Sequence, residues 1–159
     1  MTIDKATLTA YKPPVGNQKE PATQRDRLPL QYNPTRLGLV KETQWARHST
    51  RLAPHTSVPE FLGSRPRTLT MSVVFDESAP DGTTVNSRIA MLTTWCEPDR
   101  DSLHANESSP PWLKLSWGKV STAQFWMVLR RMSVEYTRFS TDGRVLRAQC
   151  ELVLEEVGV

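Results

Sequence analysis

Cysteine is scarce in this 159-residue sequence: only Cys96 and Cys150 occur, far apart and without a CxxC pair. A secreted disulfide scaffold of this size needs more cysteines, so we expect a chain made in a reducing compartment. Both cysteines fall on apolar stripes of predicted elements, and we expect two free, buried thiols. The first residues lack the apolar segment of a signal peptide, and no run approaches the ~18 apolar residues of a membrane span. We therefore predict assembly in the cytoplasm and no membrane span.

Concentrated charge of one sign is also missing. The chain has 20 Lys and Arg against 17 Asp and Glu, for a formal net charge of +3, and no run of five like charges. Nucleic-acid-binding domains usually gather their basic residues in a stripe or patch. We therefore expect no nucleic-acid partner.

Motifs of catalysis and cofactor binding are absent as well. The sequence holds no G-x-S-x-G, no P-loop and no G-x-G-x-x-G. Three histidines fall in predicted loops without the spacing of a zinc site: His48, His55 and His104. We predict no catalytic residue, no cofactor and no metal ion, and a chain that is not an enzyme.

Two other function classes stay open at this point. A tightly bound metal or a perturbed carboxylate in the cluster of Glu97, Asp99 and Asp101 would indicate an enzyme, although such a cluster is commonly a solvated loop. An enclosed apolar cavity would indicate a β-barrel that binds a small ligand or carbohydrate. The residues expected to line it are Trp112, Trp117 and Trp126. Tryptophans at strand spacing more often serve core and interface packing.

The first half of the chain predicts short strands joined by long loops. Alternating apolar residues predict strands over 6–10, 28–32 and 37–45. The second of these belongs at a sheet edge, because Pro29 has no N–H to donate to a neighbouring strand. Residues 15–26 and 46–66 read as loops.

The second half is more regular. Strands are predicted over 69–75, 113–117, 125–139 and 146–154, with a hairpin turn at Asp142-Gly143 and a bulge near Arg130-Arg131 where the apolar parity changes. A helix starting at Thr83 or Thr84 and ending before Pro98 carries one apolar stripe, made of Val85, Ile89, Leu92 and Cys96. Residues 99–110 read as a loop. Six or seven strands around one helix predict an α+β fold, mainly an antiparallel β-barrel or sandwich with long loops.

The order of short motifs along the chain is itself informative. In the first half these are K-A-T-L at 5–8, K-P-P at 12–14, L-Q-Y-N-P at 30–34, L-G-L at 37–39, Trp45 and P-E-F-L-G at 59–63. In the second half they are the strand from Leu69 to Asp76, the segment from P-P at 110–111 to W-G at 117–118, Tyr136, Phe139, D-G at 142–143 and R-A at 147–148. In this order and spacing the chain resembles the contractile injection system tube protein family. It departs from the family at Tyr32, at residues 124–126 and at residues 145–146.

The resemblance implies a fold of the phage-tail-tube type and a structural role. By resemblance, the chain is a subunit of a homo-hexameric ring that joins the spike and baseplate to the inner tube of a phage-tail-like particle. Its partners are then further copies of itself and the inner-tube, spike and baseplate proteins; a bulk inner-tube protein is the alternative. Family members of the baseplate often continue into a LysM module. We expect a single tube-like domain over residues 1–159, without LysM and without peptidoglycan binding.

Residues 46–67 are predicted to form an extended arm that works between subunits. Their prolines (Pro54, Pro59 and Pro66) exclude a central strand. Their apolar side chains, which include Leu52, need cover, and a neighbouring subunit offers it. The expected interface residues are Val58, Phe61, Leu62, Arg65 and Arg67. The alternative is a segment that folds back over its own body.

Overall fold

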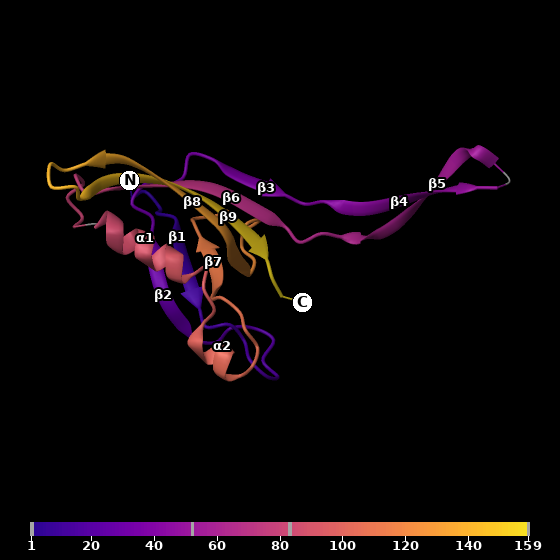
Figure 1. Ribbon diagram of the computed structural model, residues 1–159, viewed down its shortest axis with the longest axis horizontal. Helices are drawn as coiled ribbons and strands as arrows, with labels where there is room; N and C mark the ends of the chain where they lie inside the picture. Colours follow the sequence, from indigo (N-terminus) through magenta and orange to yellow (C-terminus); the bar gives the residue numbers. More distant parts are fainter. Residues whose placement is uncertain (1, 52, 83, 159) are drawn as a thin grey trace.

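A computed structural model describes residues 2–51, 53–82 and 84–158, and only the backbone at 49–50 and 53–56. In chain order the elements are β1 (Thr7–Tyr11), β2 (Gln24–Pro29), β3 (Leu37–Val40), β4 (Thr43–Thr50), β5 (Ala53–Ser64), β6 (Thr68–Asp76), α1 (Val85–Thr94), α2 (Arg100–His104), β7 (Trp112–Ser116), β8 (Met127–Phe139) and β9 (Val145–Glu156). Figure 1 shows a body of strands and helices from which one long hairpin projects.

Seven strands form one sheet in the order β2-β1-β7-β8-β9-β6-β3, with antiparallel neighbours throughout. The sheet narrows at one junction, because β7 and β8 pair only at Leu113 and Met127. It therefore consists of a three-stranded part (β2-β1-β7) and a four-stranded part (β8-β9-β6-β3). The predicted α+β class and antiparallel sheet are confirmed. Within the described ranges no barrel closes, since β2 and β3 stand at opposite ends of the strand order.

The core is one cluster of buried side chains from α1 and from both parts of the sheet. On β6 and β9 the alternating apolar residues expected from the sequence are buried: Leu69, Met71, Val73, Phe75, Ala148, Cys150, Leu152 and Leu154. α1 packs on these two strands and buries Val85, Ile89 and Leu92. The period-2 and period-3.6 patterns thus identify the two surfaces that meet in the core.

The described residues between 46 and 64 are mostly strand rather than loop. β4 and β5 pair as an antiparallel two-stranded sheet that is separate from the main sheet, and we call this hairpin the arm. Proline is tolerated here because each strand of an isolated ribbon has one free edge; Pro59, for example, pairs opposite Arg47. The strand predicted over 37–45 is divided between β3 and β4. Figure 1 shows the arm projecting far beyond the body, so it does not fold back over its own sheet.

Several element boundaries differ from those predicted. α1 ends at Thr94, and buried Trp95 follows it, so Cys96 is exposed rather than part of the apolar stripe. Thr84 is the N-cap but makes no side-chain capping hydrogen bond; Thr83, like Leu52, lies outside the described residues. The loop predicted over 99–110 contains α2, and β2 starts earlier, at Gln24, and ends at Pro29.

Other local predictions are confirmed. β2 is an edge strand, as Pro29 requires. The pairing of β8 with β9 shifts register between Leu129 and Arg131, where the bulge was predicted. Gly143 has a φ of 85° in the β8–β9 turn, a conformation that glycine adopts without the strain of a side chain. Among the described helices, none has the length and apolar character to cross a bilayer.

Candidate assembly surfaces

Among the described strands, the four-stranded part of the sheet has two free edges. One belongs to β8, which pairs with β9 along its length but touches β7 only at Met127. The other belongs to β3, whose Leu39 and Val40 are about half exposed. Unpaired strand edges present rows of backbone N–H and C=O groups and readily pair with another strand. These edges are therefore candidate sites for a second chain.

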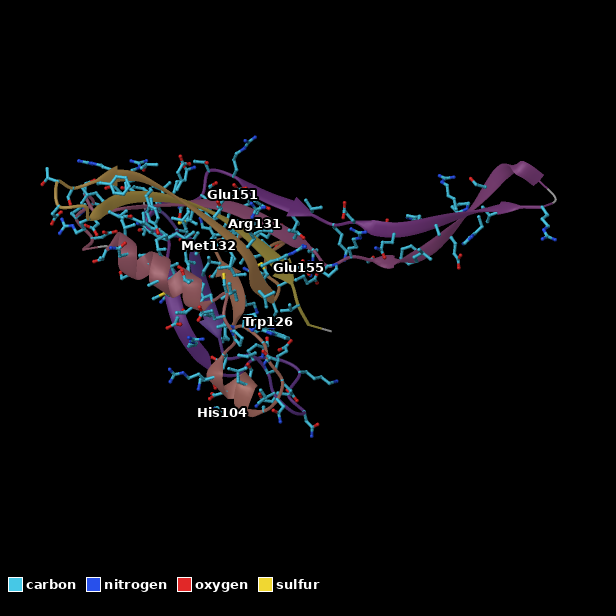
Figure 2. All side chains as sticks on the ribbon, in the orientation of Figure 1. His104, Trp126, Arg131, Met132, Glu151 and Glu155 are labelled. Carbon is cyan, nitrogen blue, oxygen red and sulfur yellow. The ribbon has the colours of Figure 1, made fainter. Side chains whose placement is uncertain are left out.

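The face of this sheet that points away from α1 is uncovered and polar. Ser133 and Glu135 on β8 lie level with Glu151 and Gln149 on β9, and all four are exposed. Figure 2 shows Arg131, Glu151 and Glu155 along these two strands. Arg130 pairs with Glu155 at 2.8 Å. The face carries charges of both signs and is suited to contact with water.

The arm carries a pair of exposed aromatic rings. Trp45 on β4 lies directly opposite Phe61 on β5, and the ring centroids are 5.3 Å apart in an edge-on arrangement. The two residues are 58% and 54% exposed, and Val58 and Leu62 are exposed to a similar degree. An apolar surface of this kind on a thin hairpin is typical of an element that contacts another protein.

The arm is shaped by a bulge and by polar side-chain pairs. Gln44 pairs with Gly63 and Trp45 with Phe61, which leaves Leu62 as the extra residue of the bulge. Gly63 has a φ of 140°, outside the range that L side chains favour. His48 Nε2 lies 2.8 Å from Glu60 Oε2 across the two strands.

Two charged clusters hold the base of the arm. In the first, the Arg65 N–H donates to the Glu42 carbonyl at 2.9 Å, and Lys41 Nζ donates to the Arg65 carbonyl at 2.8 Å. The Arg65 guanidinium also lies 3.6 Å from the Glu42 carboxylate. Arg65 is thus at the arm base with its side chain largely exposed.

The second cluster joins the arm base to the end of β9. Arg67 donates from Nε and Nη2 to the two carboxylate oxygens of Glu156, at 2.9 and 2.7 Å. These hydrogen bonds lower the pKa of Glu156 to about 2. The Arg67 guanidinium also lies 4.1 Å from the Phe125 ring centroid. The predicted interface set therefore divides: Val58, Phe61 and Leu62 are exposed on the arm, whereas Arg67 is bound to its own body.

Two of the three tryptophans proposed for a ligand cavity come together. Trp112 and Trp126 lie with ring centroids 6.3 Å apart and line a surface hollow of about 320 Å³. Lys114 Nζ lies 4.5 Å from the Trp126 ring centroid, and Tyr11 packs edge-on against the same ring. Trp117 is elsewhere and donates to the Asp4 carbonyl. The three side chains do not line one enclosed cavity.

The acidic residues after α1 make structural contacts. Asp99 is buried; it caps α2 by accepting from the Asp101 N–H and pairs with Arg25 at 3.0 Å. Asp101 pairs with Lys12 at 2.7 Å, which lowers the pKa of the Asp101 carboxyl. Across the described ranges no three His, Cys, Asp or Glu side chains are grouped as metal ligands.

The histidines are not loop residues. His48 lies on β4, His55 on β5, and His104 ends α2. Trp45, the partner of Phe61 on the arm surface, was not among the predicted interface residues, because only the cross-strand pairing reveals it.

Comparison with known families agrees with this architecture. The model of the contractile injection system tube protein family matches residues 2–158, nearly the whole chain. A search of curated proteins found no match. The chain belongs to the contractile injection system tube protein family, whose members are structural proteins of phage-tail-like particles.

Proposed function

We propose that this chain is a non-catalytic tube-like domain that closes into a ring of six copies and joins the spike and baseplate to the inner tube. The observation that carries the proposal is the pair of free edges on β8 and β3, which lie on opposite sides of one four-stranded sheet. A subunit with two different free edges can make a head-to-tail contact, and such contacts form a ring when the rotation between copies closes. Six is the ring order that the family resemblance implies.

The strand directions favour this closure. β3 runs antiparallel to β6, β6 to β9, and β9 to β8, so β3 and β8 run in opposite directions. Rotation about a ring axis preserves strand direction. β8 of one copy therefore meets β3 of the next in an antiparallel arrangement, and six four-stranded sheets form one continuous barrel without unpaired edges. The open polar face of the sheet then lines the inside of this barrel. α1 lies on the outside, because it covers the opposite face of the sheet.

The arm serves contacts between layers. β3 leads into β4 and β5 into β6, so the arm leaves the body along the strand direction, whereas ring neighbours lie across the strands. β5 has 12 residues and spans about 35 Å at the usual rise per residue. At the same rise Leu62, Phe61 and Val58 lie about 7, 10 and 20 Å out from Ser64 at the arm base, where they can contact the inner tube on one side of the ring or the spike and baseplate on the other.

The physical state of the arm supports a partner. A two-stranded hairpin alone in water is marginally stable at best. Trp45 and Phe61 leave more than half of their surface to solvent, and no described part of the body covers them. Contact with a protein in the next layer removes this apolar surface from water, and Arg65 at the arm base then adds charge pairing that fixes register more than affinity. The chain is incorporated into the particle in the cytoplasm.

The structure of the native particle tests this function. A reconstruction of purified particles is expected to place this chain in a single ring layer between spike and inner tube. A chain repeated in every layer would instead identify a bulk inner-tube protein. A particle without any ring of this chain would refute the proposal.

A further inference from the structure

One surface hollow lies beside the free edge of the four-stranded sheet, and neither the family nor the proposed ring assigns it a role. It has a volume of about 350 Å³. Its lining comes from the turn before β3 and from the open face of β6 and β9: Tyr32, Asn33, Pro34, Thr35, Ser72, Val74, Arg147 and Gln149. We call it the turn hollow.

The turn hollow exists because β3 is shorter than β6. β3 pairs with β6 only from Thr68 to Met71, so the rest of β6 has no strand on that side within the described chain. The turn occupies this place instead, fixed by Gln31, whose side chain accepts from the Asp76 N–H and donates to the Asp76 carbonyl, both at 2.7 Å. The edge that a neighbour meets is thus a short strand followed by a hollow.

We infer that the turn hollow receives residues 131–139 of β8 from the neighbouring copy in the ring. This inference rests on the proposed ring and names the contacts of its interface. Within one copy, strand pairing places Ser133 of β8 level with Glu151 of β9 and Ser72 of β6. It places Glu135 of β8 level with Gln149 of β9 and Val74 of β6. When β8 pairs with β3, its N-terminal residues lie along β3 and its C-terminal residues reach the hollow. Strand tilt in a barrel moves this match along β8 by a few residues.

Glu135 is the one acidic side chain of the incoming segment 131–139, which also carries Arg131 and Arg138, so the favourable charge contact with the hollow rests on Glu135. Arg147 and Arg138 lie opposite each other on β9 and β8, an unfavourable like-charge pair. Asp76 lies 3.3 Å from Arg147, and the Arg147 side chain stays half exposed. Glu135 of the incoming strand is exposed, and its side chain makes no ion pair or hydrogen bond in the described chain. Its carboxylate brings negative charge to this basic rim, while Tyr32 and Val74 offer apolar contact.

Crosslinking in assembled particles tests the inference. The native Cys96 is first replaced (Cys96→Ser), because it is exposed, while buried Cys150 stays. Thr35→Cys and Ser133→Cys then place thiols on the hollow and on β8. A short bis-maleimide is expected to produce a ladder of linked copies that ends at the ring size. The control pair combines Ser133→Cys with Ala90→Cys on the exposed side of α1, and it should give no ladder.

A charge reversal gives a second readout. Glu135→Arg is expected to lower incorporation into particles severalfold, with a normal melting temperature of the isolated domain. Glu151→Arg makes the same change on the same face, but on the inner strand β9, and should leave incorporation unchanged. Intact rings without the Thr35–Ser133 ladder, or equal effects of the two reversals, overturn the inference and leave the ring proposal standing. Particles that lack a ring of this chain overturn both.

Discussion

Arg67 and Glu156 form a closed set of hydrogen bonds although 89 residues separate them in sequence. The Arg67 side chain and backbone N–H both donate to the Glu156 carboxylate, and the Glu156 N–H donates to the Arg67 carbonyl at 2.8 Å. Arg67 follows the arm, and Glu156 ends β9. The contact therefore fixes the point at which the arm leaves the body.

This pair makes part of the stability depend on pH. The pKa of Glu156 is about 2 in the folded protein against an ordinary value of 4.5, so its contribution is complete above about pH 4.5 and is lost as the pH falls to about 2. We expect Glu156→Gln to reduce the free energy of unfolding by about 1–2 kcal/mol at pH 7. The pKa difference alone corresponds to roughly 3 kcal/mol, but both side chains are partly exposed and water screens them.

Denaturant unfolding from pH 7 to pH 2 measures this difference. The gap between wild type and Glu156→Gln should close as the pH falls. Glu155→Gln is the matched control, since Glu155 pairs with the exposed Arg130 and should cost at most about 0.5 kcal/mol. A gap that persists unchanged at pH 2 would show that the charge of Glu156 is not the cause.

Phe61→Ala separates assembly from folding. Phe61 is 54% exposed on the arm, so the isolated domain should keep a melting temperature within a few degrees of wild type, while incorporation into particles falls. Thermal melts and quantification of the chain in purified particles give the two readouts. Phe75→Ala, at a buried core site, is the contrast and should unfold the domain. If Phe61→Ala unfolds the isolated domain and the survivors assemble normally, the arm belongs to its own core.

Ile89→Asp tests the packing of α1 on the sheet. Ile89 is only 8% exposed, and a carboxylate there is buried without a partner, so we expect a loss of about 3–5 kcal/mol. Ala90→Asp places the same charge on the exposed side of the same helix and should cost about 1 kcal/mol or less. Circular dichroism during chemical unfolding compares the two. A soluble Ile89→Asp variant with wild-type stability would show that this face of α1 does not pack in the core.

Thiol labelling distinguishes the two cysteines. Cys96 is exposed and Cys150 is buried, and both are free. Burial raises the pKa of Cys150 to about 11. The pKa of Cys96 is also raised, by the partial burial of its thiol and by the nearby Glu97 carboxylate. Mass spectrometry should find one label per native chain, faster at alkaline pH because the thiolate reacts, and two labels after unfolding. Two labels on the native protein, or none on the unfolded one without reductant, would contradict these positions.

The sequence predicted the elements whose side chains alternate between core and solvent. Leu69 to Phe75 on β6 and the stripe of Val85, Ile89 and Leu92 on α1 lie where periodicity placed them. Burial on one face leaves a regular pattern in the sequence, so strands and helices of this kind are readable. The exposed Cys96 shows the limit of the pattern, since α1 ends at Thr94, two residues before it.

The arm left no such pattern, because neither of its faces is buried against the body. Trp45 and Phe61 are 16 positions apart and meet only through the hairpin register. The three prolines of the arm segment also indicated a loop, although a two-stranded ribbon tolerates proline at its free edges. The pairing of Arg67 with Glu156 could not be foreseen either, because it depends on which strand ends the sheet brings together.

Ring closure through β8 and β3 is the central claim, and a reconstruction of the native particle at side-chain resolution tests it most directly. The expected density shows six copies in one layer, with β8 of each copy antiparallel to β3 of the next and the arms directed along the particle axis. Density in which this chain occurs as a single copy, or in which these two edges face solvent, would contradict it.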